Sequence, residues 1–224
     1  MDVNFFLKTA ILIIGAYLLG SIPSAYLAGR LIKGIDLRKY GSGTVSGSMV
    51  YEHVAKWAVV PVGIFDIAKA ALPTWIGMRL GLGEIVALMA GTASSIVHNW
   101  PIYLGFTGGR GLSTFAGIML VLFPEGLLWM GGFLLVGWLL GDSAPWAFVS
   151  LISMPIFGEI IGKSHIAILV GLSILIVTVI KRIEANRRPL PEGELERRKV
   201  LLRRLIFDRD IKSHQTWINR KPEK

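Results

Sequence analysis

The chain has 224 residues, of which 53% are hydrophobic and only 17% are charged. Roughly a quarter of the residues in soluble domains are charged, so this composition argues against an ordinary soluble enzyme and favours a membrane protein. The net charge is +9 and there are no cysteines, which excludes disulfide frameworks, thiol nucleophiles and cysteine-bound metals.

Seven charge-poor segments follow one another along the chain. They cover residues 5–28, 57–78, 85–106, 112–123, 126–140, 143–158 and 164–180. About 20 apolar residues are needed to cross a bilayer, so the short fourth and fifth segments are the least secure. We therefore expect an all-α membrane protein with about seven transmembrane helices. A cleaved signal peptide at the start is the less favoured interpretation, because Asp2 opposes Lys8 and more hydrophobic segments follow.

The basic residues indicate how the chain is oriented. Of the 24 lysines and arginines, 14 lie from residue 181 onward, where there are 7 acidic residues. With seven spans, residues 29–56 and 107–111 lie on the same side of the membrane as this basic end. Because cytoplasmic loops carry an excess of lysine and arginine, we predict an external N-terminus and a cytoplasmic C-terminus.

The charge also divides the chain into two parts. Residues 1–183 are predicted to form a multi-pass transmembrane domain and residues 184–224 a basic cytoplasmic tail. Residues 192–205 resemble an amphipathic helix, and such a helix just inside a membrane typically lies on anionic headgroups. No aromatic interleaving or nucleic-acid module accompanies the charge, so membrane lipids, and not nucleic acid, are the expected partner.

The first candidate site is the polar loop at residues 35–49. Three glycines, three serines and one threonine fall within residues 41–49, shortly after Arg38 and Lys39. Glycine lets successive backbone N–H groups turn toward one anion, and the hydroxyl groups add further donors. The loop is therefore a candidate phosphate site, with a flexible connector as the alternative.

The second candidate site is a glycine-rich turn at residues 106–114, which enters the fourth apolar segment. A turn at a helix N-terminus offers unpaired N–H groups and the positive end of the helix dipole. Arg110 adds a side chain that can bind phosphate or carboxylate through two hydrogen bonds. The turn lacks the pattern of a nucleotide-binding P-loop.

Three ionisable side chains accompany these loops. Asp66 and Lys69 share one face of a predicted helix, where they either pin the helix in a bundle or contact a substrate. His98 precedes the glycine-rich turn and is interpreted either as a hydrogen-bonded core residue or as a general base or phosphate contact. No pair of histidines has metal-ligand spacing, and no metal or other cofactor is expected.

In this order, the motifs resemble the bacterial membrane glycerol-3-phosphate acyltransferases that use an acyl-phosphate donor. The resemblance covers about residues 10 to 195. The motifs that carry it are, in chain order, GSIPSAY at 20–26, GIDLR at 34–38, GSG at 41–43, DIAK at 66–69, HNWP at 98–101, GGRG at 108–111, VSLIS at 149–153 and Asn186. The chain departs from the family pattern at Met49, Glu52, Arg110, Ala147 and Ala185. Glu52 stands where the family has arginine, so we expect like-charge repulsion to weaken phosphate binding.

The resemblance implies transfer of a fatty acyl group from acyl-phosphate to glycerol 3-phosphate, giving lysophosphatidic acid in the first step of phospholipid synthesis. It implies the bacterial inner membrane, with the active face cytoplasmic, and no protein nucleophile, because the donor carbonyl is already activated. The implied catalytic residues are His98, Ser42 and Arg38, and the implied phosphate and substrate ligands are Gly41, Gly43, Gly108, Gly109, Arg110, Gly111, Ser150, Asn186, Asp66 and Lys69. Two alternatives remain: a divergent family member with another acceptor or no activity, and a small membrane transporter or lipid-binding scaffold.

Overall fold

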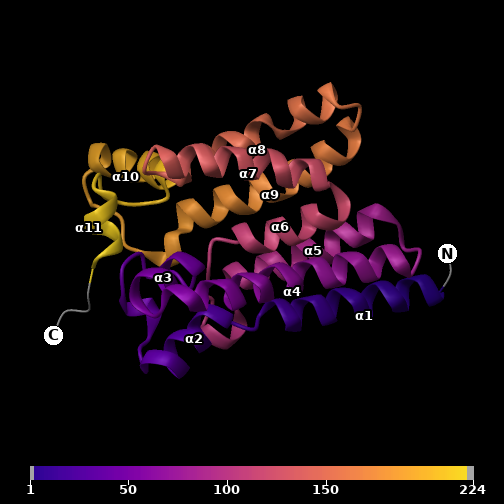
Figure 1. Cartoon of the computed structure of the whole chain (residues 1–224), viewed down its shortest axis with the longest axis horizontal. Helices are drawn as coiled ribbons and strands as arrows, with labels where there is room; N and C mark the ends of the chain where they lie inside the picture. The colour runs from indigo at the N-terminus through magenta and orange to yellow at the C-terminus, as the bar shows by residue number, and fades with distance from the viewer. Residues whose placement is uncertain (1–2, 221–224) are drawn as a thin grey trace.

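The computed structural model describes residues 3–220, which fold into helices joined by short turns (Figure 1). Within this described part there is no β-strand, so the expected all-α class is confirmed. The predicted transmembrane domain includes residues 1–2 and the predicted tail includes residues 221–224, and both of these segments lie outside the described residues.

Each of the seven predicted apolar segments contains a long helix. These helices are α1 (Val3–Gly20), α4 (Val59–Arg79), α5 (Gly83–Asn99), α6 (Leu112–Leu122), α7 (Pro124–Leu139), α8 (Ser143–Ile160) and α9 (Ser164–Glu184). Within residues 3–220, four stretches are long and apolar enough to cross a membrane: Val3–Lys33, Lys56–Arg79, Ser143–Ile160 and Ser164–Arg187. The helices α6 and α7 are apolar but shorter, as their sequences suggest.

Prolines end two of the apolar segments earlier than hydropathy indicates. The first segment was expected to be one helix, but α1 ends at Gly20 and α2 (Ser24–Lys33) begins after Pro23. Similarly, α5 ends at Asn99, shortly before Pro101. Proline lacks the N–H group that continues a helix, so the chain turns at both places and backbone groups become available for other contacts.

The helices pack in two groups. In the first group, α4 contacts α1, α5 and α6; in the second, α8 contacts both α7 and α9. Figure 1 shows the second group above the first. The two groups meet where α9 contacts α5 and α6, around buried Phe115, Ile118, Met154 and Ile174. A Cβ atom on Gly117 would overlap the backbone of α4, so glycine allows α6 to approach that helix closely.

The outer surface of the helices is strongly apolar. Ile11 and Leu18 on α1, and Leu128 and Leu139 on α7, are among many large apolar side chains that are exposed. A soluble monomer rarely exposes so much contiguous apolar surface, whereas helices in a bilayer are surrounded by lipid. The exposed surface therefore agrees with the membrane character expected from composition.

The connecting segments gather at the two ends of the bundle. The first described residues and the turns α4–α5, α6–α7 and α8–α9 lie at one end (Figure 1). The opposite end holds the short helices η1 (Leu37–Lys39), α3 (Gly47–His53), η2 (Lys56–Ala58), η3 (Ile102–Leu104) and η4 (Ala185–Arg187), the α7–α8 turn and the tail. Both candidate glycine loops and the basic tail therefore lie at the same end of the bundle, which is what the predicted orientation in the membrane requires.

The tail forms α10 (Glu194–Phe207), close to the expected position, and the short helix α11 (His214–Ile218). Helix α10 packs against α8 and α9, where the buried Arg204 donates hydrogen bonds to the carbonyl oxygens of Ile183 and Arg188. The tail is thus attached to the end of the bundle. Contact of α10 with the membrane surface stays a prediction.

Candidate active site

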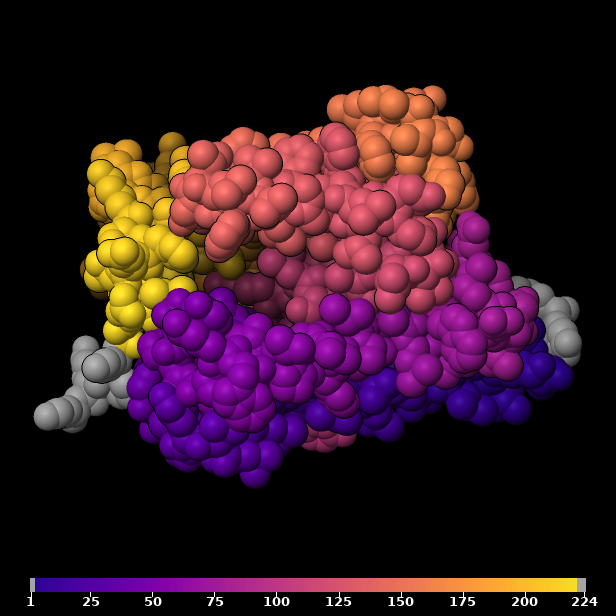
Figure 2. Space-filling model, viewed as in Figure 1, coloured from indigo at the N-terminus to yellow at the C-terminus, as the bar shows by residue number. Residues whose placement is uncertain are grey.

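A cavity of about 650 Å³ lies at the end of the bundle that carries the glycine loops. Figure 2 shows the molecule hollowed there, between the purple N-terminal segments, the coral α7–α8 region and the yellow tail. The walls come from both candidate loops, the first half of α4, the α7–α8 turn and the tail. Five predicted site residues line the cavity: Ser42, Asp66, His98, Arg110 and Gly111.

The first loop presents a row of hydroxyl groups to the cavity. Gly41 and Gly43 have φ angles of 48° and 68°, a left-handed conformation that glycine adopts without strain. The row consists of Ser42, Thr44, Ser46 and Ser48, whose hydroxyl oxygens follow one another at 2.6, 3.0 and 3.0 Å. All four line the cavity, so the loop offers several adjacent donors and acceptors in place of one.

The second loop passes directly over His98. The N–H group of Gly109 donates to the carbonyl oxygen of His98 at 3.1 Å. A Cβ atom on Gly108 would overlap that oxygen, and a Cβ atom on Gly109 would overlap the imidazole ring. Gly111 follows with a φ of 81° and precedes the first turn of α6. Glycine at 108 and 109 is therefore required for the backbone to lie this close to the histidine.

Backbone and amide hydrogen bonds join the two loops. The Val45 N–H group donates to the carbonyl oxygen of Gly108 at 3.1 Å. The side-chain amide of Asn186 donates to the carbonyl oxygens of Gly43 and Gly108, both at 3.2 Å. Its oxygen accepts a 2.6 Å hydrogen bond from the ammonium group of Lys181. Three segments that are distant in sequence are thereby fixed around one cavity.

Asp66 contacts the other ionisable side chains that lie beneath the two loops. Its Oδ1 atom accepts a 2.6 Å hydrogen bond from Ser24 and lies 2.9 Å from the ammonium nitrogen of Lys69. The same oxygen lies 3.7 Å from Nδ1 of His98. Lys69 also donates to the carbonyl oxygen of Ile22, which the break between α1 and α2 exposes. Asp66 and His98 line the cavity, whereas Lys69 is buried behind them.

Arg110 extends from the second loop toward the tail. One guanidinium nitrogen donates to the carbonyl oxygen of Lys181 at 3.0 Å. Its Nε atom lies 3.0 Å from a carboxylate oxygen of Asp208, in the turn that follows α10. The expected arginine is therefore in the cavity wall, beside an anionic group of the same chain.

The other eight predicted site residues lie outside the lining of this cavity: Arg38, Gly41, Gly43, Lys69, Gly108, Gly109, Ser150 and Asn186. Six of them belong to the loop contacts and the charged group described above, and the two that do not are Arg38 and Ser150. Arg38 pairs with Asp36 at 2.7 Å and donates to the carbonyl oxygen of Leu104. Its hydrogen bonds hold the pKa of the Asp36 carboxyl below the ordinary value. Ser150 is buried within α8, where its hydroxyl donates to the carbonyl oxygen of Ala147. Among the described residues, these two side chains are not in the cavity wall.

The structure shows the surroundings of two departures from the family pattern. Glu52 is exposed on α3 and is not among the described residues that line the cavity, which removes the reason to expect repulsion there. The second departure, Ala185, directly follows Glu184, whose carboxylate takes part in the network around Asn186. This carboxylate accepts from Lys181 at 3.2 Å, Trp100 at 3.1 Å and the N–H group of Asn186 at 3.1 Å.

Sequence reasoning missed the residues that the tail contributes. The tail residues in the cavity wall are Phe207, Asp208, His214, Trp217 and Ile218. No motif pointed to them, because they lie beyond the region of family resemblance. Within residues 3–220, no group of histidine and acidic side chains is arranged to hold a metal ion.

Comparison with known proteins agrees with this arrangement. The sequence profile described as glycerol-3-phosphate acyltransferase matches residues 10–191. The chain belongs to the glycerol-3-phosphate acyltransferase family. The resemblance drawn from the motifs is thereby confirmed over most of the chain.

One relative of this acyltransferase-family chain covers nearly its whole length, and another covers about three quarters of it. It is 34% identical over 220 residues to glycerol-3-phosphate acyltransferase 5 of Dehalococcoides mccartyi, covering 94% of this chain and 92% of the relative. It is 35% identical over 172 residues to the glycerol-3-phosphate acyltransferase of a Synechococcus species, covering 77% of this chain and 78% of the relative.

Two crystal structures of PlsY, an integral membrane glycerol 3-phosphate acyltransferase, share the fold. The glycerol 3-phosphate form matches with a TM-score of 0.67 and 30% identity, over 84% of this chain and 98% of PlsY. The lysophosphatidic acid form matches with a TM-score of 0.62 and 29% identity, over 86% and 99%. Nearly all of PlsY has a counterpart here, so the unmatched residues belong mainly to this chain. The described residues of this chain are thus all-helical and share the fold of an integral membrane protein.

Proposed function

We propose that the chain transfers a fatty acyl group from acyl-phosphate to the sn-1 hydroxyl of glycerol 3-phosphate. The product is lysophosphatidic acid, formed in the first step of phospholipid synthesis. The observation that carries this proposal is the pairing of two glycine loops around one cavity with His98. A reaction between two phosphate-bearing substrates needs two anion-binding segments side by side, and membership of the family supports the same reaction.

The chemistry requires positioning and charge stabilisation. The glycerol hydroxyl oxygen forms a bond to the acyl carbonyl carbon, the bond from that carbon to the phosphate oxygen breaks, and inorganic phosphate leaves with the electron pair. His98, beside Asp66 in the cavity wall, orients the hydroxyl and accepts its proton. N–H groups and hydroxyls near Ser42 hold one phosphate, and Arg110 with the adjacent N-terminus of α6 holds the other.

A direct assay tests the reaction. Purified full-length protein in detergent is incubated with palmitoyl-phosphate and labelled glycerol 3-phosphate, and the expected product is labelled lysophosphatidic acid. A second arm replaces the donor with palmitoyl-coenzyme A, from which we expect little product. Absence of product in the first arm from a folded sample would contradict the proposal and favour a divergent family member without this activity.

The finer topology is also a proposal. We infer about seven transmembrane helices in a bacterial inner membrane, with an external N-terminus and a cytoplasmic C-terminus. Residues 1–183 then form the multi-pass transmembrane acyltransferase domain and residues 184–224 a basic cytoplasmic tail with a helix on the membrane surface. The expected partners are acyl-phosphate, glycerol 3-phosphate and membrane lipids, and not nucleic acid. The gathering of both loops and the basic tail at one end of the bundle supports a cytoplasmic active face (Figure 1).

A further inference from the structure

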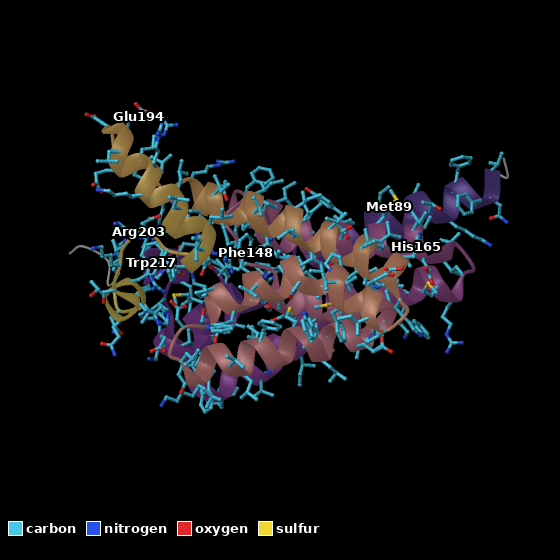
Figure 3. The ribbon with its side chains drawn as sticks, turned by 90° about the horizontal axis from the view of Figure 1, so that it is seen from above. Met89, Phe148, His165, Glu194, Arg203 and Trp217 are labelled. Carbon is cyan, nitrogen blue, oxygen red and sulfur yellow. The ribbon has the colours of Figure 1, made fainter. Side chains whose placement is uncertain are left out.

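The tail is held firmly on the end of the bundle. Arg182 of α9 donates to the carbonyl oxygens of Leu205 and Ile206 at the end of α10, and Arg209 pairs with Asp142 in the α7–α8 turn. In Figure 3, Arg203 and Trp217 of the tail lie at the end of the molecule opposite His165. These anchors fix the position of Asp208, which lies between α10 and Arg209.

Asp208 directs its carboxylate at the arginine of the second glycine loop. The distance to Nε of Arg110 is 3.0 Å, and the two side chains are 22% and 13% exposed. The other carboxylate oxygen, Oδ1, is buried without a hydrogen-bond partner among the described residues. The Nε atom of Arg110 likewise lacks a partner of hydrogen-bond geometry within this part of the chain. The contact is therefore an ion pair that leaves polar atoms unsatisfied on both sides.

The end of the tail also contacts the first glycine loop. The Gly41 N–H group donates to the carbonyl oxygen of Arg220 at 2.8 Å, and a ring nitrogen of His53 lies 2.8 Å from the carbonyl oxygen of Ile218. Arg188 lies over the ring of Trp217 at 4.3 Å and donates to the carbonyl oxygen of Gly41. The tail thus contacts both segments assigned to phosphate binding.

We propose that Asp208 competes with a substrate phosphate for Arg110, so that the tail lowers the phosphate affinity of the cavity. This inference rests on the proposed function, which assigns a phosphate to Arg110. A guanidinium group binds carboxylate and phosphate through the same donors, so both anions require the same side chain. A phosphate that enters beside Arg110 also meets the negative charge of Asp208, unless the tail moves away.

The test uses the full-length protein and a substitution that removes the charge but keeps the shape. Asp208 has a φ of 54°, which asparagine tolerates, so Asp208→Asn preserves the backbone. We expect the Kd for inorganic phosphate, measured by calorimetry in detergent, to fall roughly tenfold in this variant. In the parent, phosphate must displace the charged Asp208 carboxylate from Arg110, whereas the uncharged asparagine makes a weaker contact that is easier to displace. An unchanged or higher Kd would overturn the proposal.

Asp210→Asn is the matched control. Asp210 lies two residues further along the tail and pairs with Arg204 and Arg188, outside the described cavity lining. Phosphate affinity should stay at the parental value in this variant. An equal tightening there would show that loosening of the tail, and not the charge of Asp208, changes the affinity, and would contradict the proposal.

Kinetics identify which phosphate is affected. The KM values for glycerol 3-phosphate and for palmitoyl-phosphate are compared between the parent and Asp208→Asn, and the substrate with the larger fall is the one that Arg110 binds. Phosphate binding does not require turnover, so the two proposals fail separately. Tighter phosphate binding without acyl transfer contradicts the proposed reaction alone, whereas acyl transfer with unchanged phosphate affinity contradicts the competition alone.

Discussion

Asn186 connects both glycine loops with one side-chain amide. Asn186→Ala removes two hydrogen bonds to loop carbonyl groups, each worth about 1 kcal/mol, so we expect the acyl-transfer rate to fall at least about tenfold. Asn186→Asp keeps the acceptor for Lys181 but turns a carboxylate oxygen toward the carbonyls of Gly43 and Gly108. It should therefore be no more active than the alanine variant. Initial rates compare the variants, and parental activity in Asn186→Asp would show that the bridge is dispensable.

Gly109 tests how closely the second loop must approach His98. A Cβ atom at this position would overlap the imidazole and lie 2.9 Å from the carbonyl oxygen of Val45. We expect Gly109→Ala to lower the acyl-transfer rate more than tenfold while circular dichroism shows unchanged helix content, because the reacting groups are displaced and the bundle is not. Gly131→Ala on α7 is the control, since its added Cβ meets no atom within 4 Å and should leave the rate unchanged.

At the residue scale, the sequence predicts which segments bind anions but not how they pair. The glycines and Arg110 carry a chemical signal, whereas the Val45–Gly108 hydrogen bond joins backbone groups that any residue possesses. Residues 185–187 all have positive φ angles, between 47° and 59°. This left-handed turn follows α9 directly, and a helical pattern does not reveal where its side chains point.

At the element scale, the buried Arg204 is one of the side chains that attach α10 to the end of the bundle. Arg204→Met removes hydrogen bonds to three carbonyl groups and the pair with Asp210, and we expect a loss of about 2 kcal/mol and a Tm lower by roughly 5 °C in detergent. Arg198→Met is the control, because Arg198 and Glu194 form a fully solvated pair with 73% and 77% exposure. Equal Tm values for the two variants would contradict the assigned anchoring.

Hydropathy predicted the existence of the long helices better than their ends. Hydropathy averaged over residues 5–28 does not reveal the turn at residues 21–23, although this segment contains Pro23. That turn has a structural use, since the freed carbonyl oxygen of Ile22 accepts a hydrogen bond from buried Lys69. The tail helix was also found near its predicted position, but its packing against α8 and α9 follows from side chains whose partners lie far away in sequence.

At the scale of the whole molecule, the natural absence of cysteine makes the topology directly testable. Single cysteines are introduced at exposed Glu84, in the first turn of α5, and at exposed Glu196 on α10. With an external N-terminus, a membrane-impermeant maleimide should label Glu84→Cys in spheroplasts and label Glu196→Cys only after lysis. The reverse pattern would contradict the proposed orientation.

The cavity has walls of two kinds. Its polar side is made by the hydroxyl row with Asp208 and His214 of the tail, whereas Val59, Leu112 and the 71% exposed Trp138 form an apolar side next to the apolar outer surface. In the proposed reaction, a water-soluble acceptor and a lipid-like donor then reach the same site from different phases. The donor's effective concentration is its mole fraction in the bilayer, so the surrounding membrane composition, as much as the protein, sets how fast the reaction runs.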